Sequence, residues 1–339
     1  MTAGLPNRRK TEDGSLAEIL PTADAMEPAL ALLEGGDVVA IPTETVYGLA
    51  GDATRGEAVA RIYEAKGRPR FNPLIAHVAD IAMAERLGVL DANSRLLADR
   101  FWPGPLTMVV PLREGSPVHP LVTAGLPTVA LRMPMGFAAG VIARLGKPLA
   151  APSANSSGRI SATTAAAVEA DLGRRIKLIV DGGPTPIGLE STIVKADGEG
   201  LRLLRPGGIA AEDIEAAIGR HLVRGPGPGV EAPGMLASHY APGAAVRVGA
   251  TDVREGEVLL AFGPRRIPGA ENAALVLNLS KVGDLREAAT NLFAHLQALD
   301  RTGAAVIAVE PVPVTGLGEA INDRLARAAA PRDTDRQPS

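Results

Sequence analysis

The sequence predicts an α/β protein of two domains. The larger is expected to have a mixed sheet with helices, and the smaller a Rossmann-like parallel sheet. The chain has 339 residues, more than an average single domain. Short apolar runs alternate with segments of helical periodicity along most of it. Residues 224–234 hold four glycines and three prolines. Because such a stretch cannot continue a helix or a central strand, it divides the chain.

In the larger domain, strands and helices are interleaved. Residues 57–66 are expected to be helical because Val59, Ile62 and Tyr63 fall on one face. The expected strands cover residues 38–41, 74–78, 106–112, 129–132, 149–151, 178–180 and 191–194. The other expected helices cover residues 82–87, 94–100, 138–145 and 163–172.

The smaller domain alternates strands and helices, the order typical of a parallel sheet. Strands are expected at residues 257–262, 274–278 and 305–309, and helices at 285–299 and 316–325. The turn Gly316-Leu317-Gly318 resembles a nucleotide-binding turn, but Ile321 stands at the third glycine position. We therefore expect a structural turn and no bound dinucleotide.

The expected division has five parts. They are a mobile tail (1–21), the larger domain (22–215), a Gly/Pro-rich linker (216–242), the smaller domain (243–331) and a second tail (332–339).

Composition excludes several classes of protein. The absence of cysteine excludes disulfides, thiolate catalysis and Cys-based zinc sites, and none of the five histidines lies in an HExxH pattern. A net charge of −3 gives no global attraction to nucleic acid or anionic membrane. No segment reaches the ~20 apolar residues of a membrane helix, and residues 1–15 lack a signal-peptide run. A cytoplasmic protein is expected.

Two polar clusters stand near expected strand ends. Thr43, Glu44 and Thr45 follow the first strand, where side chains can meet a ligand or simply cap a turn. Lys66, Arg68 and Arg70 place three cations within five residues. Guanidinium groups suit phosphate oxygens, although a solvated basic loop gives the same pattern.

Two further clusters follow. Residues 151–159 form a Ser/Asn-rich loop before a helix, which can bind an anion through its N–H groups or be capped by Ser161 or Thr163. In residues 181–194, Asp181 and Glu190 could hold a cation or an ammonium group, and Arg205 lies shortly beyond. The P-loop and GxSxG patterns are absent. Together the clusters predict a pocket for a polyanion and a small zwitterion.

Seven motifs in order resemble the YrdC/Sua5 family. They read PTETVYGLAGDA, KGRPRFNPLIAHV, FWPGPLTMVV, TVALRMP, APSANSSG, GLESTIV and LRPGGI. The following SHYAPG and the second domain resemble the Sua5 branch, the L-threonylcarbamoyladenylate synthases. The resemblance covers residues from about 22 to about 330. It implies a YrdC-like mixed twisted sheet with helices and a Sua5-type C-terminal α/β domain.

The resemblance implies a nucleotidyltransferase. L-threonine, ATP and either bicarbonate or CO2 would give threonylcarbamoyl-AMP and pyrophosphate. Mg²⁺ would be bound by the ATP phosphates, and no protein residue is assigned as its ligand. A tRNA threonylcarbamoyl-transferase complex would use the product for the t6A modification at tRNA position 37. Lys66 and Arg68 would be catalytic. The implied ATP-binding residues are Lys66, Arg68, Asn72, Thr128, Asn155, Ser161, Thr163, Arg205 and Tyr240. The implied threonine-binding residues are Thr45, His77, Arg132, Ser153 and Ser191.

The linker departs from the family pattern. It would act as an active-site lid, with Tyr240 closing over the site, but Ala232 replaces a serine and Leu236-Ala237-Ser238 replace a Lys-Tyr-Arg trio. Weaker phosphate contacts from the lid are expected.

Three alternative functions are considered. One is a non-catalytic module that binds double-stranded RNA or tRNA, with Arg55 and Arg61 adding to a basic face; a weak RNA contact is also compatible with the synthase. The few aromatic residues disfavour base stacking. A hydrogenase-maturation carbamoyltransferase would carry Cys-rich zinc fingers, which are absent. A non-catalytic paralogue is disfavoured by the intact Lys66/Arg68 and Ser153/Asn155 pairs.

Overall fold

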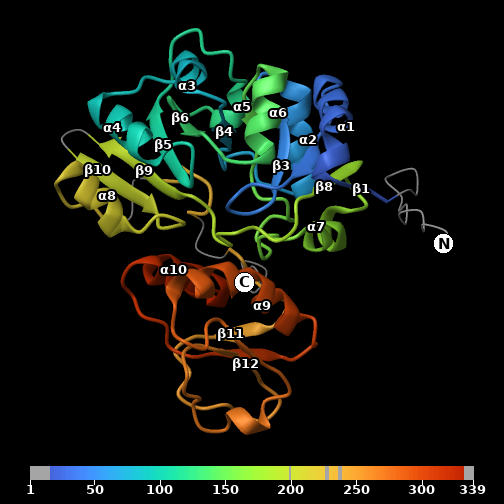
Figure 1. Ribbon diagram of the computed structural model, residues 1–339, viewed down its shortest axis with the longest axis vertical. Helices are drawn as coiled ribbons and strands as arrows, with labels where there is room; N and C mark the ends of the chain where they lie inside the picture. The colour runs from blue at the N-terminus through green and yellow to red at the C-terminus, as the bar shows by residue number, and fades with distance from the viewer. Residues whose placement is uncertain (1–15, 198–199, 226–228, 236–238, 332–339) are drawn as a thin grey trace, which may run out of the picture.

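The computed structural model describes residues 16–197, 200–225, 229–235 and 239–331. Figure 1 shows a large domain that ends near residue 223 and a small domain that begins after the linker. This confirms the predicted mixed α/β domain with a second, parallel-sheet domain.

A ten-stranded mixed sheet forms the centre of the large domain. The sheet contains both parallel pairs, such as β4–β6, and antiparallel pairs, such as β5–β6. From edge to edge the strands are β1 (Glu18–Pro21), β8 (Leu178–Asp181), β2 (Val39–Ile41), β3 (Gly48–Asp52), β7 (Leu149–Ala150), β4 (Ile75–His77), β6 (Thr128–Arg132), β5 (Leu106–Pro111), β9 (Thr192–Asp197) and β10 (Gly200–Arg205).

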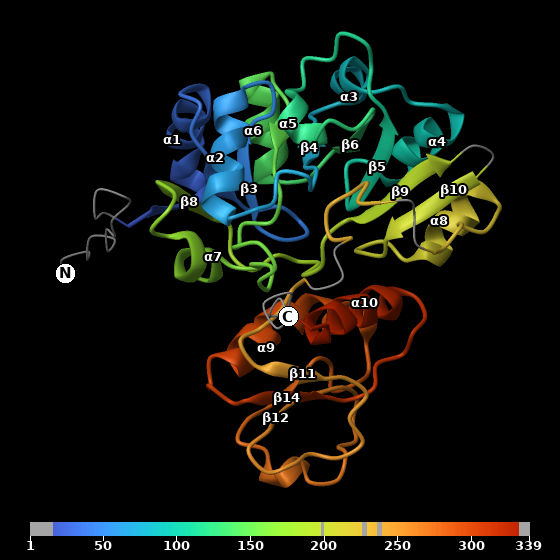
Figure 2. The same ribbon diagram turned by 180° about the vertical axis from the view of Figure 1, so that it is seen from behind.

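Helices pack on this sheet and bury one continuous apolar core. Helices α1, α2 and α6 lie together at one end of the domain, and α4 and α8 lie at the other (Figure 2). The helices are α1 (Thr22–Glu34), α2 (Gly56–Lys66), α3 (Ile81–Leu87), α4 (Ala92–Phe101), α5 (Pro120–Thr123), α6 (Phe137–Leu145), α7 (Ala165–Leu172) and α8 (Ala211–Ile218).

The small domain has a wholly parallel sheet in the order β11-β14-β12-β13. Helices α9 and α10 lie between this sheet and the large domain (Figures 1 and 2). The elements are β11 (Ala245–Arg247), β12 (Val258–Ala261), the 3-10 helix η1 (Ala270–Asn272), β13 (Val276–Asn278), α9 (Leu285–Asp300), β14 (Val306–Val309) and α10 (Leu317–Ala329).

The structure moves two expected boundaries. Residues 18–21 form β1, which pairs with β8, so a tail extending to residue 21 is wrong for these four residues. Residues 216–223 stay with the large domain: α8 packs on α4, and Val223 exchanges backbone hydrogen bonds with β10. The linker therefore begins later than residue 216. The two outer tails lie outside the described residues, apart from residues 16–21.

Several elements carry a weak local signal. Strand β3 reads Gly-Leu-Ala-Gly-Asp, a composition that disfavours strands, yet it is held between β2 and β7. Helix α1 contains Pro28 and has no side-chain cap. Tertiary packing overrides local propensity in both cases.

Gly318 has a steric role in the first turn of α10. A Cβ on Gly318 would lie 1.9 Å from the carbonyl oxygen of Pro313, so only glycine fits there. The Gly318→Ala variant should lose about 3 kcal/mol of stability, because the backbone must move. Urea unfolding should show the loss. Gly140→Ala, in helix α6, is the matched control. A Cβ on Gly140 would meet only Met26 Cε, at 3.4 Å. We expect that control to be neutral or slightly stabilising; equal midpoints for both variants would refute the steric argument.

Candidate active site

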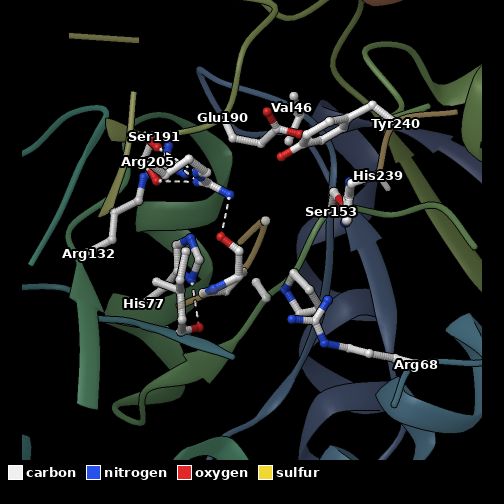
Figure 3. A pocket seen from close by; sticks show the side chains of 15 residues that line it. Val46, Arg68, His77, Arg132, Ser153, Glu190, Ser191, Arg205, His239 and Tyr240 are labelled. Carbon is white, nitrogen blue, oxygen red and sulfur yellow. Dashed lines mark hydrogen bonds between the residues drawn. The ribbon is translucent and has the colours of Figure 1, made fainter. Parts of the chain in front are cut away.

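Strand ends and loops of the large domain surround one cavity of about 40 Å³. His77 ends β4 and lies opposite Arg132 at the end of the parallel strand β6. Arg205 ends β10, and Ser153 follows β7. Figure 3 shows these side chains around the cavity. Its charged and polar lining consists of Arg68, His77, Arg132, Ser153, Glu190, Ser191, Arg205, His239 and Tyr240.

Three buried cations stand at this site without a carboxylate partner among the described residues. Lys66, 2% exposed, donates to the carbonyl oxygens of Ser153 at 2.5 Å and of Asn155. Arg68 donates to Asn72 Oδ1 at 2.7 Å and to a neighbouring carbonyl. Arg205 donates to the Ser191 carbonyl at 2.8 Å. Because carbonyl oxygens carry no full charge, the cluster has an uncompensated positive charge.

Burial changes the ionisation of these groups. It lowers the pKa of Lys66 well below its usual range, and the neighbouring Arg68 adds to the effect. Burial likewise lowers the pKa of Arg68 to about 10 and lowers the pKa of Arg205. A bound polyanion would reverse these shifts, so the site is electrostatically suited to phosphate groups.

Four buried polar atoms at the site have no hydrogen-bond partner among the described residues. They are Asn72 Nδ2, Asn155 Oδ1, His239 Nδ1 and the Tyr240 hydroxyl. An unpaired buried donor or acceptor costs about 1–3 kcal/mol, so a ligand that pairs with these atoms would recover that energy.

The wall near Arg132 is suited to a small polar molecule. Arg132 Nη2 donates to Glu44 Oε1 at 2.7 Å, and Glu44 also accepts from the backbone N–H of Met135. Burial and the charge of Arg132 lower the pKa of His77 to about 3, so this imidazole is neutral near pH 7. His77 Nδ1 donates to the Ile75 carbonyl at 3.3 Å, which leaves Nε2 as an acceptor. Ser191 shares a 2.7 Å hydrogen bond with Thr107.

The linker covers the cavity. Pro233, Gly234, His239 and Tyr240 line it, and Tyr240 has a left-handed backbone with φ of 62°. A Cβ on Gly234 would lie 2.8 Å from the Tyr240 hydroxyl, so this close approach requires glycine. The buried Tyr240 ring stacks on Phe293 of α9 at 5.5 Å between centroids. The linker therefore joins the cavity to the small domain.

Other expected site residues lie just outside the cavity. Thr45 is buried and bonded to Thr43 at 2.8 Å. Ser161 donates to Glu190, and the Thr163 carbonyl accepts from the Thr185 N–H. Thr128 begins β6, at the strand end remote from Arg132, and does not line this cavity.

Two expectations from the sequence need correction, and one cannot be compared with the described residues. Thr164, rather than Ser161 or Thr163, caps α7 by accepting from the Ala167 N–H. Asp181 and Glu190 do not hold a cation together: Asp181 is exposed at the end of β8, and Glu190 binds a guanidinium group from α10. The divergent residues 236–238 lie outside the described residues.

Sequence reasoning missed two contributors. Arg324 of α10 and His239 both reach the site from beyond the large domain. His239 stands beside Tyr240 in the SHYAPG motif, which was a usable signal. No sequence signal indicated Arg324, because a single arginine on an amphipathic helix is expected to be an exposed surface residue.

Four of the five residues that suggested an RNA-binding face have partners within the protein or are buried, and Arg70 is exposed. Arg55 donates to the Glu34 carbonyl and lies near Glu57, and Arg61 pairs with Asp37. Lys66 and Arg68 are buried. Among the described helices, none combines the length and the apolar character that crossing a membrane requires.

The mixed α/β fold and its buried cationic pocket define an enzyme of the nucleotidyltransferase type. The family model described as Telomere recombination matches residues 31–207, and the model described as Threonylcarbamoyl-AMP synthase, C-terminal domain, matches residues 209–330. The chain belongs to the Sua5 branch of the YrdC/Sua5 family, the threonylcarbamoyl-AMP synthases.

Relatives of similar length share both domains. The threonylcarbamoyl-AMP synthase of Bacillus subtilis is 43% identical over 90% of this chain and 92% of its own length. The crystal structure of Pyrococcus abyssi Sua5 complexed with L-threonine has a TM-score of 0.84 at 39% identity, covering 92% of this chain and 98% of that one. A Mycobacterium tuberculosis relative is 36% identical, and the match spans 88% of that relative but only 56% of this chain.

Proposed function

We propose that the protein converts L-threonine, bicarbonate or CO2 and ATP into threonylcarbamoyl-AMP and pyrophosphate. The observation that carries this proposal is the buried cluster of Lys66, Arg68 and Arg205, which has no carboxylate partner among the described residues. It lies beside a second set of groups, Arg132 and His77, suited to an amino acid. The threonine in the P. abyssi complex supports the choice of substrate.

The proposed reaction has two bond-forming steps. The neutral amine of threonine attacks CO2, forming an N–C bond and releasing one proton to water. An oxygen of the resulting carbamate then attacks the α-phosphorus of ATP. The bond between that phosphorus and the oxygen bridging to the β-phosphate breaks, and pyrophosphate leaves with the electron pair. Lys66 and Arg68 act as the catalytic cations by stabilising the charge that builds on the phosphates.

The proposed substrate sites meet at the cavity and extend beyond its lining residues. Arg132 pairs with the threonine carboxylate, and Thr45, His77, Ser153 and Ser191 complete the threonine site. The nucleotide contacts Lys66, Arg68, Asn72, Thr128, Asn155, Ser161, Thr163, Arg205 and Tyr240. The unpaired atoms of Asn72, Asn155 and Tyr240 support these nucleotide assignments.

Magnesium enters this proposal bound to ATP. The described residues contain no cluster of three or more carboxylate or histidine side chains able to cage a metal ion. Glu190 lines the cavity but already binds Ser161 and Arg324. Mg²⁺ prefers phosphate oxygens and water, and it would add positive charge at the leaving pyrophosphate.

The size of the cavity requires the linker to move during the cycle. A volume of about 40 Å³ holds roughly three water molecules and is too small for ATP. Tyr240 and Gly234 must therefore withdraw before the nucleotide enters, and their return would exclude water from a labile carbamoyl-adenylate.

The product would supply the t6A modification of tRNA. A tRNA threonylcarbamoyl-transferase complex would accept the threonylcarbamoyl group, which places this enzyme upstream of it in the cytoplasm. Any direct contact of the synthase with RNA would be weak, because Arg55 and Arg61 already have partners within the protein.

Pyrophosphate release from ATP tests the proposed reaction. Release should require both threonine and bicarbonate, and mass spectrometry should detect threonylcarbamoyl-AMP. Omission of either co-substrate is the control. Release that is independent of threonine, or no release with the complete mixture, would contradict the proposal.

A further inference from the structure

Arg324 of α10 is buried at the junction of the two domains. It is 0% exposed, although it belongs to the small domain. Its Nε donates to Glu190 Oε2 at 2.9 Å, and its Nη2 donates to the Pro206 carbonyl at 2.9 Å. Its guanidinium carbon lies 4.9 Å from the centroid of the Tyr240 ring. One side chain of the small domain thus contacts both the wall and the cover of the cavity.

Glu190 is the only carboxylate among the described residues that line the cavity. Burial by itself would raise the pKa of Glu190, but the charges of Arg324 and Arg205 overcome this effect and hold it at about 2. Glu190 is therefore ionised near pH 7. An ionised carboxylate beside the phosphate site repels a triphosphate unless a cation compensates it.

The cation that compensates Glu190 comes from the other domain. Arg205 donates to Ser191 and to the Pro233 carbonyl, and it does not contact Glu190 directly. Ser161 donates to Glu190 Oε1 but carries no charge. Among the described residues, only Arg324 pairs with Glu190 as an ion.

We propose that Arg324 is a positioning residue of the nucleotide site, which neutralises Glu190 and holds Tyr240 in place when the small domain is docked. This inference rests on the proposed function, because it takes the triphosphate of ATP as the ligand. With α10 docked, Arg68 and Arg205 face a cavity whose only carboxylate among the described lining residues is paired. With α10 withdrawn, Glu190 is an unpaired negative charge in the same wall.

The arrangement couples two equilibria. If docking of α10 strengthens ATP binding, ATP must strengthen docking by the same factor, because the two free energies are linked. The small domain then does more than cover the cavity: it sets the affinity of the site for a polyanion. Threonine, which is held near Arg132 in the proposal, should be much less sensitive to Arg324.

A double-mutant cycle tests the proposal. The variants are Arg324→Gln, Glu190→Gln and the two together, and the measurement is the Kd of a non-hydrolysable ATP analogue by calorimetry at fixed salt. Arg324→Gln alone should weaken binding by about tenfold or more, because Glu190 is left unpaired. In the Glu190→Gln background the same substitution should cost less than about threefold, because no charge remains to compensate. A purely structural role would not produce this rescue.

Two further variants control for packing. Arg224→Gln removes another ion pair between the domains, the 3.2 Å contact of Arg224 with Glu319, which lies away from the cavity. This variant should change the Kd of the ATP analogue by less than about twofold. Arg324→Lys keeps the charge and should stay within about threefold of the unchanged protein, even if Arg324→Gln fails to fold. The Kd of threonine and the thermal unfolding midpoint report whether each variant remains folded.

The outcomes are distinct. Three results would overturn the role of Arg324 and leave the synthase proposal intact. The first is an equal loss of ATP affinity from Arg324→Gln in both backgrounds, and the second is no loss at all. The third is a loss from Arg324→Lys as large as the loss from Arg324→Gln. Failure of the unchanged protein to bind the ATP analogue would overturn the proposed function, and the inference with it.

Discussion

Replacing Lys66 with methionine should reduce the rate of pyrophosphate formation by about 10³-fold. Lys66 is buried at the end of α2 and points at the carbonyl oxygens of Ser153 and Asn155, in the loop proposed to meet the nucleotide. Methionine keeps the length and apolar stem of the side chain but removes the charge. A charged donor that acts on a developing negative charge contributes several kcal/mol to the transition state, which sets the size of the effect.

The comparison needs a matched lysine elsewhere. Lys177→Met removes an exposed lysine that pairs with Asp37, and it should leave the rate within about twofold. The unfolding midpoint of Lys66→Met should not fall, because the substitution removes a buried charge that has no carboxylate partner. A Lys66→Met enzyme that keeps more than a tenth of the activity would remove Lys66 from the proposed catalytic group.

Deleting residues 225–339 should uncouple ATP consumption from product accumulation. Without Tyr240, His239 and the small domain, the cavity opens to water, and the carbamoyl-adenylate hydrolyses where it forms. We expect the yield of threonylcarbamoyl-AMP per pyrophosphate to fall by roughly tenfold. Quantifying both products over the same time course measures this ratio.

A full-length variant provides the control for this deletion. Gly188 packs on α9, and a Cβ there would lie 2.5 Å from Thr290 Cα. Gly188→Ala should therefore displace the small domain without removing it, and should lower the same ratio in part. An unchanged ratio in the truncated protein would refute the proposal that the linker acts as a lid.

Local sequence patterns predicted most of the regular structure. The strands at 75–77, 106–111 and 128–132 and the helices α2 and α9 all lie where apolar periodicity placed them. The patterns gave no expectation for β1, α1, β3, α5, β10, α8, β11 and η1. The weak signal of β3 and α1 is overcome by burial against neighbours that are distant in the chain.

The order of motifs along the chain determined by itself the family, the enzyme class and the set of candidate residues. It could do so because seven motifs in the same order as in the family are far more specific than any single motif. Only the tertiary structure decided which of these groups share a cavity and which stand behind it. It also showed that Lys66, Arg68 and Arg205 have no carboxylate partner among the described residues. Glu190, by contrast, forms an ion pair with Arg324. The pairing of buried charges depends on how two domains dock, and docking depends on surfaces assembled from the whole chain.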